Sequence, residues 1–284
     1  MLKLGIIGYG FVGKAIDYAF STPSTEIYKV DPILGTTVAS MYEHFTPDVV
    51  FVSVPTPMAE SGSIDSSIIK SVVTELPSEV LVVIKSTVTP DVLEELHGIH
   101  PNLVFNPEFL TERRAEADFI YADFLLFGGD VAKCEYVKSL YDRHSKCAEC
   151  PVVYVDLKTA SLVKYTLNCY KASKVLFFNQ IFDIFTHTGS TGSWNDFVQA
   201  LRNDSLIGPT HMQVPGPDGK FGYGGACFPK DTTAFAKYAQ DLGVPFTALE
   251  EVIRANQEIR NQYELNSREQ DQNVQFNFVP SRQK

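Results

Sequence analysis

The sequence is poor in cysteine, in positive charge and in long apolar segments. It has five cysteines among 284 residues, without the regular spacing of a disulfide framework, so we expect a protein of a reducing compartment such as the cytoplasm. Asp and Glu outnumber Lys and Arg by 34 to 24, which gives a formal net charge of −10. Such a charge disfavours nucleic acid or an anionic membrane as a partner.

Targeting and metal-binding segments are also scarce. No apolar run reaches the length of a membrane-spanning helix. Met1 to Leu4 leads straight into a strand pattern, so we expect no secretory signal peptide. Cys147 and Cys150 have C-x-x-C spacing, but no second pair of Cys or His completes a zinc set. We therefore expect no metal.

The first half of the chain alternates short apolar runs with helical stretches. Buried strands separated by helices indicate a parallel sheet that is covered on both faces. We therefore predict an α/β fold, a Rossmann-like doubly wound parallel sheet, over residues 1–156. The expected strands are Leu2–Ile7, Glu26–Val30, Asp48–Val54, Val80–Lys85, Leu103–Asn106, Phe124–Gly128 and Val152–Asp156.

The second half is helical in pattern. Residues from Leu157 to about His187 contain neither Gly nor Pro, which predicts one helix of about 30 residues. Its apolar positions exceed what one face of a small domain needs, so we expect it to form a dimer interface. We predict a smaller all-helical central domain for dimerisation and substrate binding over 157–263, and a loose polar tail over 264–284. Shorter helices are expected at Asp196–Arg202, Lys230–Leu242 and Ala248–Tyr263.

A glycine turn follows the first expected strand. Gly8-Tyr9-Gly10-Phe11-Val12-Gly13 has G-x-G-x-x-G spacing and precedes a helix pattern at Val12–Phe20, with Asp31 ending the second strand. This is the context of a dinucleotide fingerprint, in which the glycines allow a tight turn, admit the pyrophosphate and let the helix pack on the strand. Asp31 would accept hydrogen bonds from the ribose hydroxyls and oppose a 2′-phosphate. We therefore predict NAD, in preference to NADP.

Two further turns follow the third and fourth strands. They read Val54-Pro55-Thr56-Pro57 and Lys85-Ser86-Thr87-Val88. Ligands of open α/β sheets bind beyond the carboxyl ends of the strands, so we expect Pro55, Thr56 and Thr87 to contact the cofactor. A plain turn is the alternative for the prolines.

A glycine-rich loop near the end of the chain delivers a cysteine. It reads Gly222-Tyr223-Gly224-Gly225-Ala226-Cys227-Phe228-Pro229-Lys230-Asp231. Glycines let backbone approach a ligand closely. A thiol beside a cation ionises early, and Pro229 can open a helix whose N-terminus lies near Cys227. The alternative is a small residue buried in a glycine turn, but these neighbours favour a nucleophile.

Together these segments resemble the UDP-glucose/GDP-mannose dehydrogenase family. The matching segments occur in the family's order over most of the chain. They are Gly8 to Gly13, Val54 to Pro57, Lys85 to Val88, Asn106-Pro107-Glu108-Phe109-Leu110, Lys164 with Asn168, and Gly224 to Asp231. Within the family, the chain is most similar to members that oxidise UDP-glucose.

The resemblance implies oxidation of the C6 hydroxyl of a nucleotide sugar to a carboxylate with two NAD, as in polysaccharide biosynthesis. One hydride leaves to give an aldehyde, and Cys227 attacks it to form a thiohemiacetal. A second hydride leaves to give a thioester, which water hydrolyses. An aldehyde lacks an alkoxide-like centre that can expel hydride, and the cysteine supplies one.

The resemblance also implies roles for residues around the cysteine. Lys164 and Asn168 are four residues apart, so they share a helix face and can stabilise an oxyanion. Asp231 would hold a water or assist proton transfer. Glu108 would be the general base for the hydrolytic water, which Thr87 positions.

Other residues are expected to bind the two ligands. Glu112 resembles the family residue on the nicotinamide side of NAD, and Lys230 is also expected at the cofactor. A solvated helix face for Lys164 and Asn168, and surface carboxylates for Glu108 and Glu112, are the alternatives. Besides Lys164, Asn168 and Cys227, the residues expected to bind substrate are Phe109, Leu110, Phe221, Tyr223 and Gly224.

The chain departs from the family in two ways. The family's Asp-x-Arg-Ile-Gly segment, whose arginine reaches the sugar across a dimer, reads Asp204-Ser205-Leu206-Ile207-Gly208 here. Family members also carry a further C-terminal nucleotide-binding domain, whereas this chain ends soon after the central helices. Leu206 lacks the charge for the cross-subunit sugar contact. The chain is either a naturally short form or a truncated one, and for this reason we expect weaker substrate binding.

Two other functions remain open. A non-catalytic NAD-binding homologue would explain Leu206 and the short C-terminus, but not the full set of catalytic candidates. A 3-hydroxyacid or 6-phosphogluconate-type dehydrogenase shares the layout of a Rossmann domain and a long helix. That chemistry uses a lysine and needs no cysteine, so Cys227 discriminates against it.

Overall fold

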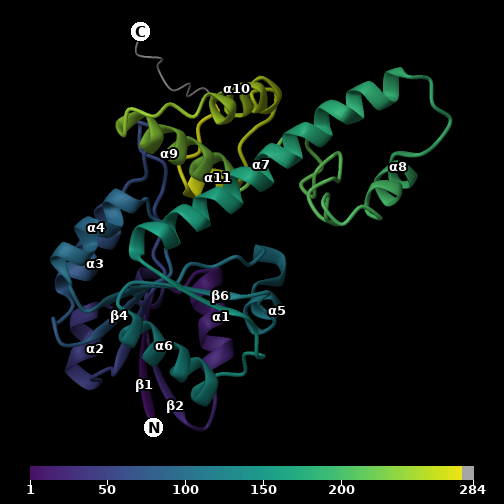
Figure 1. Ribbon diagram of the computed structural model, residues 1–284. Coiled ribbons are helices and arrows are strands. Elements are labelled where there is room, and N and C mark those ends of the chain that lie inside the picture. The colour runs from purple at the N-terminus through teal and green to yellow at the C-terminus, as the bar shows by residue number, and fades with distance from the viewer. Residues whose placement is uncertain (277–284) are drawn as a thin grey trace. The chain divides into compact units, whose positions relative to one another are not determined.

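The computed structural model describes residues 1–276, and the chain divides into two compact units (Figure 1). Unit 1 comprises residues 1–56 and 65–164. Unit 2 comprises residues 57–64 and the chain from Tyr165 onward. The division lies inside the long helix α7 (Leu157–His187), and not before it. The first turns of α7 therefore belong to the sheet domain.

Unit 1 contains one seven-stranded sheet in the order β2-β1-β3-β4-β5-β6-β7. Every strand expected from the sequence is present, and the α/β, Rossmann-like class is confirmed. The four pairings among β1 to β5 are parallel. The strands are β1 (Leu2–Ile7), β2 (Thr25–Val30), β3 (Val49–Val52), β4 (Leu81–Ile84), β5 (Leu103–Phe105), β6 (Leu125–Gly128) and β7 (Val152–Val155).

The last two strands run against the other five. β6 pairs with β5 in antiparallel fashion, with Phe105 opposite Gly128, and β7 is parallel to β6. The expectation of a wholly parallel sheet was therefore wrong at this edge. A parallel neighbour needs a crossover that returns the chain to the same end of the sheet. The chain between β5 and β6 instead enters β6 from the carboxyl end of β5.

Helices cover both faces of this sheet. On one face, α1, α5 and α6 share an apolar core in which the rings of Phe20 and Tyr141 meet edge to face at 5.2 Å. On the other face α2 packs so closely that a Cβ on Gly5 would lie 3.0 Å from the sulfur of Met41. Helices α3 and α4 pack on each other, and Figure 1 shows them on the same side of the sheet as α2. The helices are α1 (Phe11–Phe20), α2 (Val38–His44), α3 (Ser67–Glu75), α4 (Pro90–Ile99), α5 (Ala115–Ile120) and α6 (Val131–His144), with single turns at η1 (Pro32–Leu34) and η2 (Glu112–Arg114).

Helix α7 has 31 residues, as the absence of Gly and Pro predicted. Its first turns are fixed to unit 1, because the hydroxyl of Ser161 donates to the carbonyl of Val88 at 2.7 Å. A Cβ on Gly128 of β6 would lie 2.6 Å from the Cβ of Ala160. This close packing and the hydrogen bond of Ser161 fix the first turns of α7 against the sheet.

Unit 2 is helical in the part of the chain that the structure describes. Its helices after α7 are α8 (Trp194–Leu201), α9 (Phe228–Asp241), α10 (Thr247–Arg260) and α11 (Ser267–Asp271). The end of α7 and α8 share an aromatic cluster around Trp194, whose ring stacks on Phe197 at 5.0 Å and meets Phe182 at 5.1 Å. Among residues 1–276, we find no helix both long and apolar enough to cross a membrane.

Residues 264–276 are not a loose tail. Asn266 and Glu269 form a reciprocal capping box that starts α11, and Val274 and Phe276 are buried. The capping-box pattern and these two apolar residues were visible in the sequence, but a polar composition masked them. The rest of the expected tail, 277–284, lies outside the described residues.

Candidate functional site

The glycine turn between β1 and α1 leaves no room for larger residues at two positions. Gly8 has a φ of +88°, and a Cβ there would lie 2.6 Å from the carbonyl oxygen of Ser53. A Cβ on Gly13 would lie 2.1 Å from the carbonyl oxygen of Gly8. Backbone atoms cannot yield at these distances. Both glycines are therefore required by the close approach of α1 to the sheet.

The N-terminus of α1 fits an anionic group such as a pyrophosphate. Gly10 is the N-cap residue, no side chain caps the helix, and its first turn has no acidic residue. A Cβ on Gly10 would have no neighbour within 4 Å, so the space above the turn is open. Unsatisfied amides and the helix dipole make such an end an anion site.

The carboxylate of Asp31 is held in place beside this turn. Its Oδ2 accepts from the amide of Tyr9 at 2.7 Å, and its Oδ1 accepts from the amide of Ile33 at 2.8 Å. Each carboxylate oxygen retains a second lone pair, so Asp31 can still accept a hydrogen bond from a ribose hydroxyl. The side chain of Tyr9 contacts residues of α1 and β2. Its hydroxyl donates to Asp17, and its ring centre lies 5.1 Å from Nζ of Lys29.

The turns after β3 and β4 are tied to each other. The hydroxyl of Thr56 donates to the carbonyl of Thr87 at 2.9 Å, and the hydroxyl of Ser86 donates to that of Val54 at 2.7 Å. Thr56 is buried, whereas Pro55 is exposed and Thr87 is half-buried. Pro55 and, in part, Thr87 are thus accessible to a ligand at the surface of these turns. Thr56 is buried, and its hydrogen bond holds the two turns together.

A buried ion pair between Lys85 and Glu108 lies at the carboxyl ends of β4 and β5. Lys85 was not among the residues that we expected to take part in catalysis or binding. Its Nζ contacts the carboxylate of Glu108 and donates to Oδ1 of Asn106 at 2.7 Å. The hydroxyl of Tyr141 donates to the same Oδ1 at 2.7 Å. The Lys85 side chain is only 1% exposed and that of Glu108 15%, so each charge depends on the other.

Burial sets the proton affinity of this pair. Burial raises the pKa of Glu108 above the ordinary carboxyl value, although Lys85 and Lys164 act in the opposite direction. Burial likewise lowers the pKa of Lys85, against the pull of Glu108. A carboxyl group whose pKa is raised toward neutrality is suited to general acid–base catalysis.

Lys164 of α7 joins this group. Its Nζ donates to the carbonyl of Glu108 and lies 5.2 Å from the ring centre of Phe109. Phe109 in turn stacks on Phe124 at 4.8 Å. Leu110 packs on the sheet core, and Glu112 is exposed at the start of η2. Unit 1 therefore brings Glu108, Phe109 and Lys164 together.

In unit 2, three polar candidates converge. Nδ2 of Asn168 donates to Oδ2 of Asp231 at 2.6 Å, and Nζ of Lys230 donates to Oδ1 at 2.6 Å. Asp231 is 1% exposed and Lys230 4%. Lys230, which we expected at the cofactor, is thus the buried partner of Asp231. These two hydrogen bonds hold the carboxylate of Asp231 in place.

Cys227 stands at the start of α9. It is the N-cap residue of the helix, with Pro229 in the first turn, and its carbonyl accepts from the amide of Asp231 at 2.8 Å. Among the cysteines, all of which the structure describes, Cys227 is the exposed one and none forms a disulfide. The alternative of a buried small residue is excluded by this exposure.

The rings of the loop before Cys227 are packed away from solvent. Tyr223, which we expected to face the substrate, is 3% exposed and lies in an apolar cluster with Leu176. Burial raises its pKa, and its hydroxyl lies 3.4 Å from that of Thr232. Phe221 packs against Phe182 at 5.8 Å. We expected Tyr223 to bind substrate, whereas the structure places its ring inside unit 2, where burial of the large apolar ring stabilises the fold.

The catalytic candidates thus form two groups, one in each unit. Unit 1 carries Thr87, Glu108 and Lys164, and unit 2 carries Asn168, Cys227 and Asp231. Lys164 and Asn168 lie one turn apart on α7, so they share a helix face. Over residues 1–276, no three His, Cys, Asp or Glu side chains are grouped as metal ligands.

Comparison with known proteins places the chain in a family. Residues 34–145 match the NAD binding domain, and residues 158–258 the central domain, of the UDP-glucose/GDP-mannose dehydrogenase family. The chain belongs to this family. Thr87 and Glu108 lie inside the first match, and the other catalytic candidates lie inside the second. The first match also identifies NAD as the cofactor, which the glycine turn at the start of unit 1 fits.

Individual relatives agree with this assignment. The UDP-glucose 6-dehydrogenase of Rickettsia felis is 30% identical over 226 residues, which are 74% of this chain and 48% of that protein. The chain therefore spans about half the length of this curated relative. A UDP-glucose dehydrogenase of Pyrobaculum islandicum has a solved structure that matches with a TM-score of 0.74 and 25% identity, over 91% of this chain and 68% of that one.

A second solved structure shares the fold. The 3-hydroxyisobutyrate dehydrogenase of Mycobacterium tuberculosis matches with a TM-score of 0.66, over 89% of this chain and 91% of that chain. The identity is 16%, so this likeness concerns the fold alone. It shows why layout by itself does not separate the two kinds of dehydrogenase.

Replacing Lys85 with methionine should destabilise the protein by about 3–5 kcal/mol, because Glu108 would lose its buried partner. Without Lys85, only Lys164 opposes the effect of burial on Glu108, so the folded-state pKa of Glu108 exceeds its unfolded value further. Such a group stabilises the fold below its unfolded pKa, and this contribution is lost as pH rises through the folded pKa. Chemical denaturation at several pH values should therefore show K85M losing stability, relative to wild type, as pH rises above the ordinary carboxyl range.

The matched control is Lys70→Met, which breaks the exposed pair between Lys70 and Glu95. It should change stability by less than about 1 kcal/mol. A K85M protein as stable as this control at neutral pH would show that the Lys85–Glu108 pair is not held in a buried site.

Proposed function

We propose that this protein uses NAD to oxidise the C6 hydroxyl of a nucleotide sugar to the uronate, with UDP-glucose as the first candidate. The observation that carries the proposal is Cys227, exposed at the start of α9 and followed by the buried Asp231 with its partner Asn168. Membership of the UDP-glucose/GDP-mannose dehydrogenase family supports it.

NAD, when bound, supplies the acceptor for each of the two hydrides that leave C6. The glycine turn and the open N-terminus of α1 would hold its pyrophosphate, and Asp31 its ribose. In the first oxidation the C6 hydroxyl gives up its proton with the assistance of Asp231, directly or through a bound water, and Lys164 and Asn168 stabilise the negative charge on the oxygen before the hydride leaves.

Cys227 makes the second oxidation possible. Its sulfur adds to the aldehyde carbon, the carbonyl π bond becomes an oxyanion, and Lys164 and Asn168 stabilise that charge. Loss of the second hydride from this adduct leaves a thioester on Cys227. Glu108 then takes a proton from a water that Thr87 positions, and the hydroxide adds to the thioester carbon. The C–S bond breaks, the thiolate returns, and the uronate is released.

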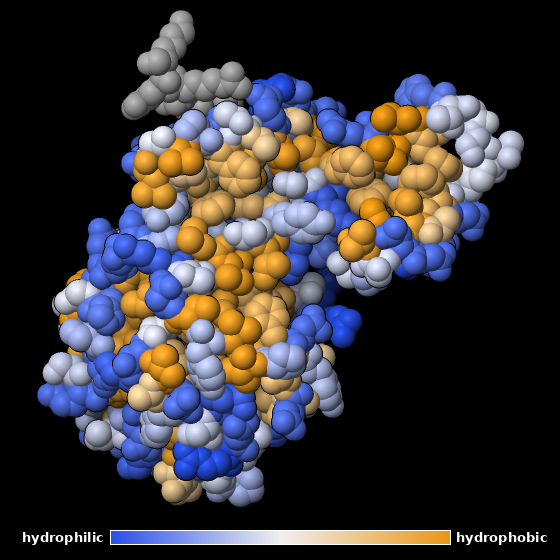
Figure 2. All heavy atoms as spheres, viewed as in Figure 1, coloured by the Kyte–Doolittle hydropathy of each residue, from blue (hydrophilic) through white to orange (hydrophobic). Residues whose placement is uncertain are grey.

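A dimer built on α7 is part of the proposal. Tyr170, Phe177 and Ile184 are 62%, 56% and 61% exposed. They are seven residues apart, so they line one face of the helix. Figure 2 shows apolar surface over the part of unit 2 that carries α7 and α8. Leu206, at the family's arginine position, is 89% exposed. Because leucine has no charge, we expect it to add no ionic contact to the sugar.

The wild-type protein should form two NADH for each nucleotide sugar consumed, when tested on a panel of UDP- and GDP-sugars. Cys227→Ser should lower steady-state NADH formation by orders of magnitude, because an alkoxide leaves poorly from an ester. NAD binding should be unchanged. Cys150→Ser is the matched control and should retain wild-type turnover.

Three outcomes would contradict this function. Wild-type turnover by C227S, with two NADH per sugar, would remove the covalent step. One NADH per substrate, with release of a ketone, would establish the hydroxyacid type of dehydrogenase instead. Binding of NAD without turnover on any sugar would favour the non-catalytic homologue.

NAD should be preferred to NADP, because the carboxylate of Asp31 opposes a 2′-phosphate. Asp31→Asn removes the charge and keeps one carbonyl acceptor for the amides that Asp31 binds. The ratio of NAD to NADP affinity, measured by calorimetry, should fall in this variant. Equal affinities for both cofactors in the wild type would refute the assignment of Asp31.

The wild type should sediment as a dimer at micromolar concentration. Arginines at Phe177 and Ile184 together should give a monomer, because they would place like charges opposite each other on an apolar interface. Arginine at Tyr121, an exposed residue of unit 1, is the control and should leave the dimer intact. A wild-type monomer, or a dimer in the double variant, would count against this interface.

A further inference from the structure

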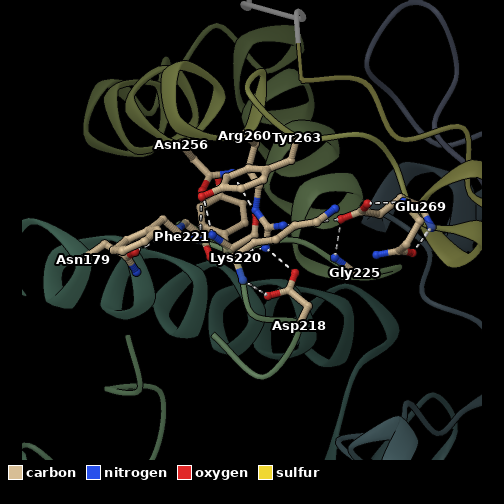
Figure 3. Close-up of polar contacts among 12 residues, drawn as sticks. Asn179, Asp218, Lys220, Phe221, Gly225, Asn256, Arg260, Tyr263 and Glu269 are labelled. Atoms are coloured by element: carbon tan, nitrogen blue, oxygen red, sulfur yellow. Dashed lines mark hydrogen bonds and ion pairs between the residues drawn. The ribbon is translucent and has the colours of Figure 1, made fainter. Parts of the chain in front are cut away.

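The backbone of the loop Gly222–Gly225 is held by buried polar side chains from three helices (Figure 3). They are Asn179 of α7, Asn256 and Arg260 of α10, and Glu269 of α11, and none is more than 2% exposed. Buried polar groups require partners. In this part of unit 2 the partners are largely the amides and carbonyls of the loop.

The first half of the loop is paired by two asparagines. Oδ1 of Asn179 accepts from the amide of Gly222 at 2.8 Å. Oδ1 of Asn256 accepts from the amide of Tyr223 at 2.7 Å, and its Nδ2 donates to the carbonyl of Tyr223 at 3.0 Å. Asn256 thus pairs with both backbone polar groups of Tyr223, as a residue of a neighbouring strand would.

The second half is held by one carboxylate. Oε1 of Glu269 accepts from the amide of Gly225 at 2.9 Å, and Oε2 accepts from the amide of Asn266 at 2.9 Å. Nη1 of Arg260 lies 4.0 Å from Oε1. Glu269 therefore joins the loop to the start of α11. The segment that looked like a polar tail in the sequence supplies this bond.

The glycines of the loop make room for these side chains. A Cβ on Gly224 would lie 2.4 Å from Nη2 of Arg260 and 2.5 Å from Oε1 of Glu269. A Cβ on Gly222, which has a φ of +71°, would lie 2.6 Å from Oδ1 of Asn256. The path of the loop and the positions of the buried polar groups therefore determine each other.

We propose that Glu269 is a positioning residue for Cys227. Gly225 is two residues before Cys227, which begins α9. A carboxylate that fixes the amide of Gly225 also fixes where the thiol lies, and α11 becomes part of the scaffold of the nucleophile. The role in catalysis rests on the function proposed above, whereas the hold on the loop does not.

Glu269→Gln tests this, because glutamine has a similar shape but no charge, and its amide nitrogen cannot accept a hydrogen bond. The amide of Gly225 or of Asn266 then loses its acceptor. Hydrogen exchange over residues 222–227 should accelerate about tenfold, while exchange in unit 1 and NAD affinity stay at wild-type values. NADH per sugar should fall from two toward one, because an ill-placed thiol captures less aldehyde. A loss of stability alone would slow turnover and leave that ratio at two.

Two further variants provide a control and a second test. Glu258→Gln makes the same substitution at an exposed residue of α10, 66% exposed and paired with Arg254; it should match the wild type in exchange and in the NADH ratio. Asn266→Ala removes the side chain that accepts from the amide of Glu269 at 3.0 Å. It keeps the charge of Glu269 and should give the same local signature at smaller amplitude.

The proposal would be overturned if hydrogen exchange over 222–227 in E269Q occurred at the wild-type rate, or if it accelerated equally over all of residues 1–276. A ratio of two NADH per sugar beside a locally accelerated loop would also overturn it. If the wild type forms no NADH from any nucleotide sugar, the proposed function fails. The exchange measurement then still decides whether Glu269 holds the loop.

Discussion

The ammonium group of Lys85, buried in unit 1, requires an anion beside it, and much of the candidate site depends on that requirement. Glu108 is the anion, and it is held at the carboxyl end of β5. Asn106 and Tyr141 complete the hydrogen bonds of the pair. Lys164 reaches the backbone of Glu108 from α7. A buried ion pair is weak evidence of stability, but removal of either member would leave the other as a buried charge without its partner.

Unit 2 also contains buried carboxylates that are paired with hydrogen-bond donors. Asp231 is buried between Asn168 and Lys230, and Glu269 is buried against the amide of Gly225. In each case a charged group fixes backbone or side chains next to Cys227. The backbone before and after the exposed Cys227 is therefore held by hydrogen bonds, which suits a nucleophile that must be placed accurately.

Features with a local signature were predictable from the sequence. Apolar runs gave the strands, the absence of Gly and Pro gave α7, and Pro229 gave the start of α9. Long-range pairings carry no such signature. The partnership of Lys85 with Glu108, the burial of Tyr223 and the direction of β6 all depend on contacts between distant segments. The α11 segment was missed for another reason, since its overall composition is polar although its cap and two apolar residues are ordinary folding signals.

The central claim is that a thioester on Cys227 links the two oxidations. It is tested most directly by quenching the wild-type reaction in acid during turnover and analysing the protein by mass spectrometry. The account predicts a uronyl group bound to the sulfur of Cys227, with two NADH formed for each sugar consumed. Full turnover to the uronate with no sugar adduct on Cys227, or release of an aldehyde or ketone with a single NADH, would contradict it.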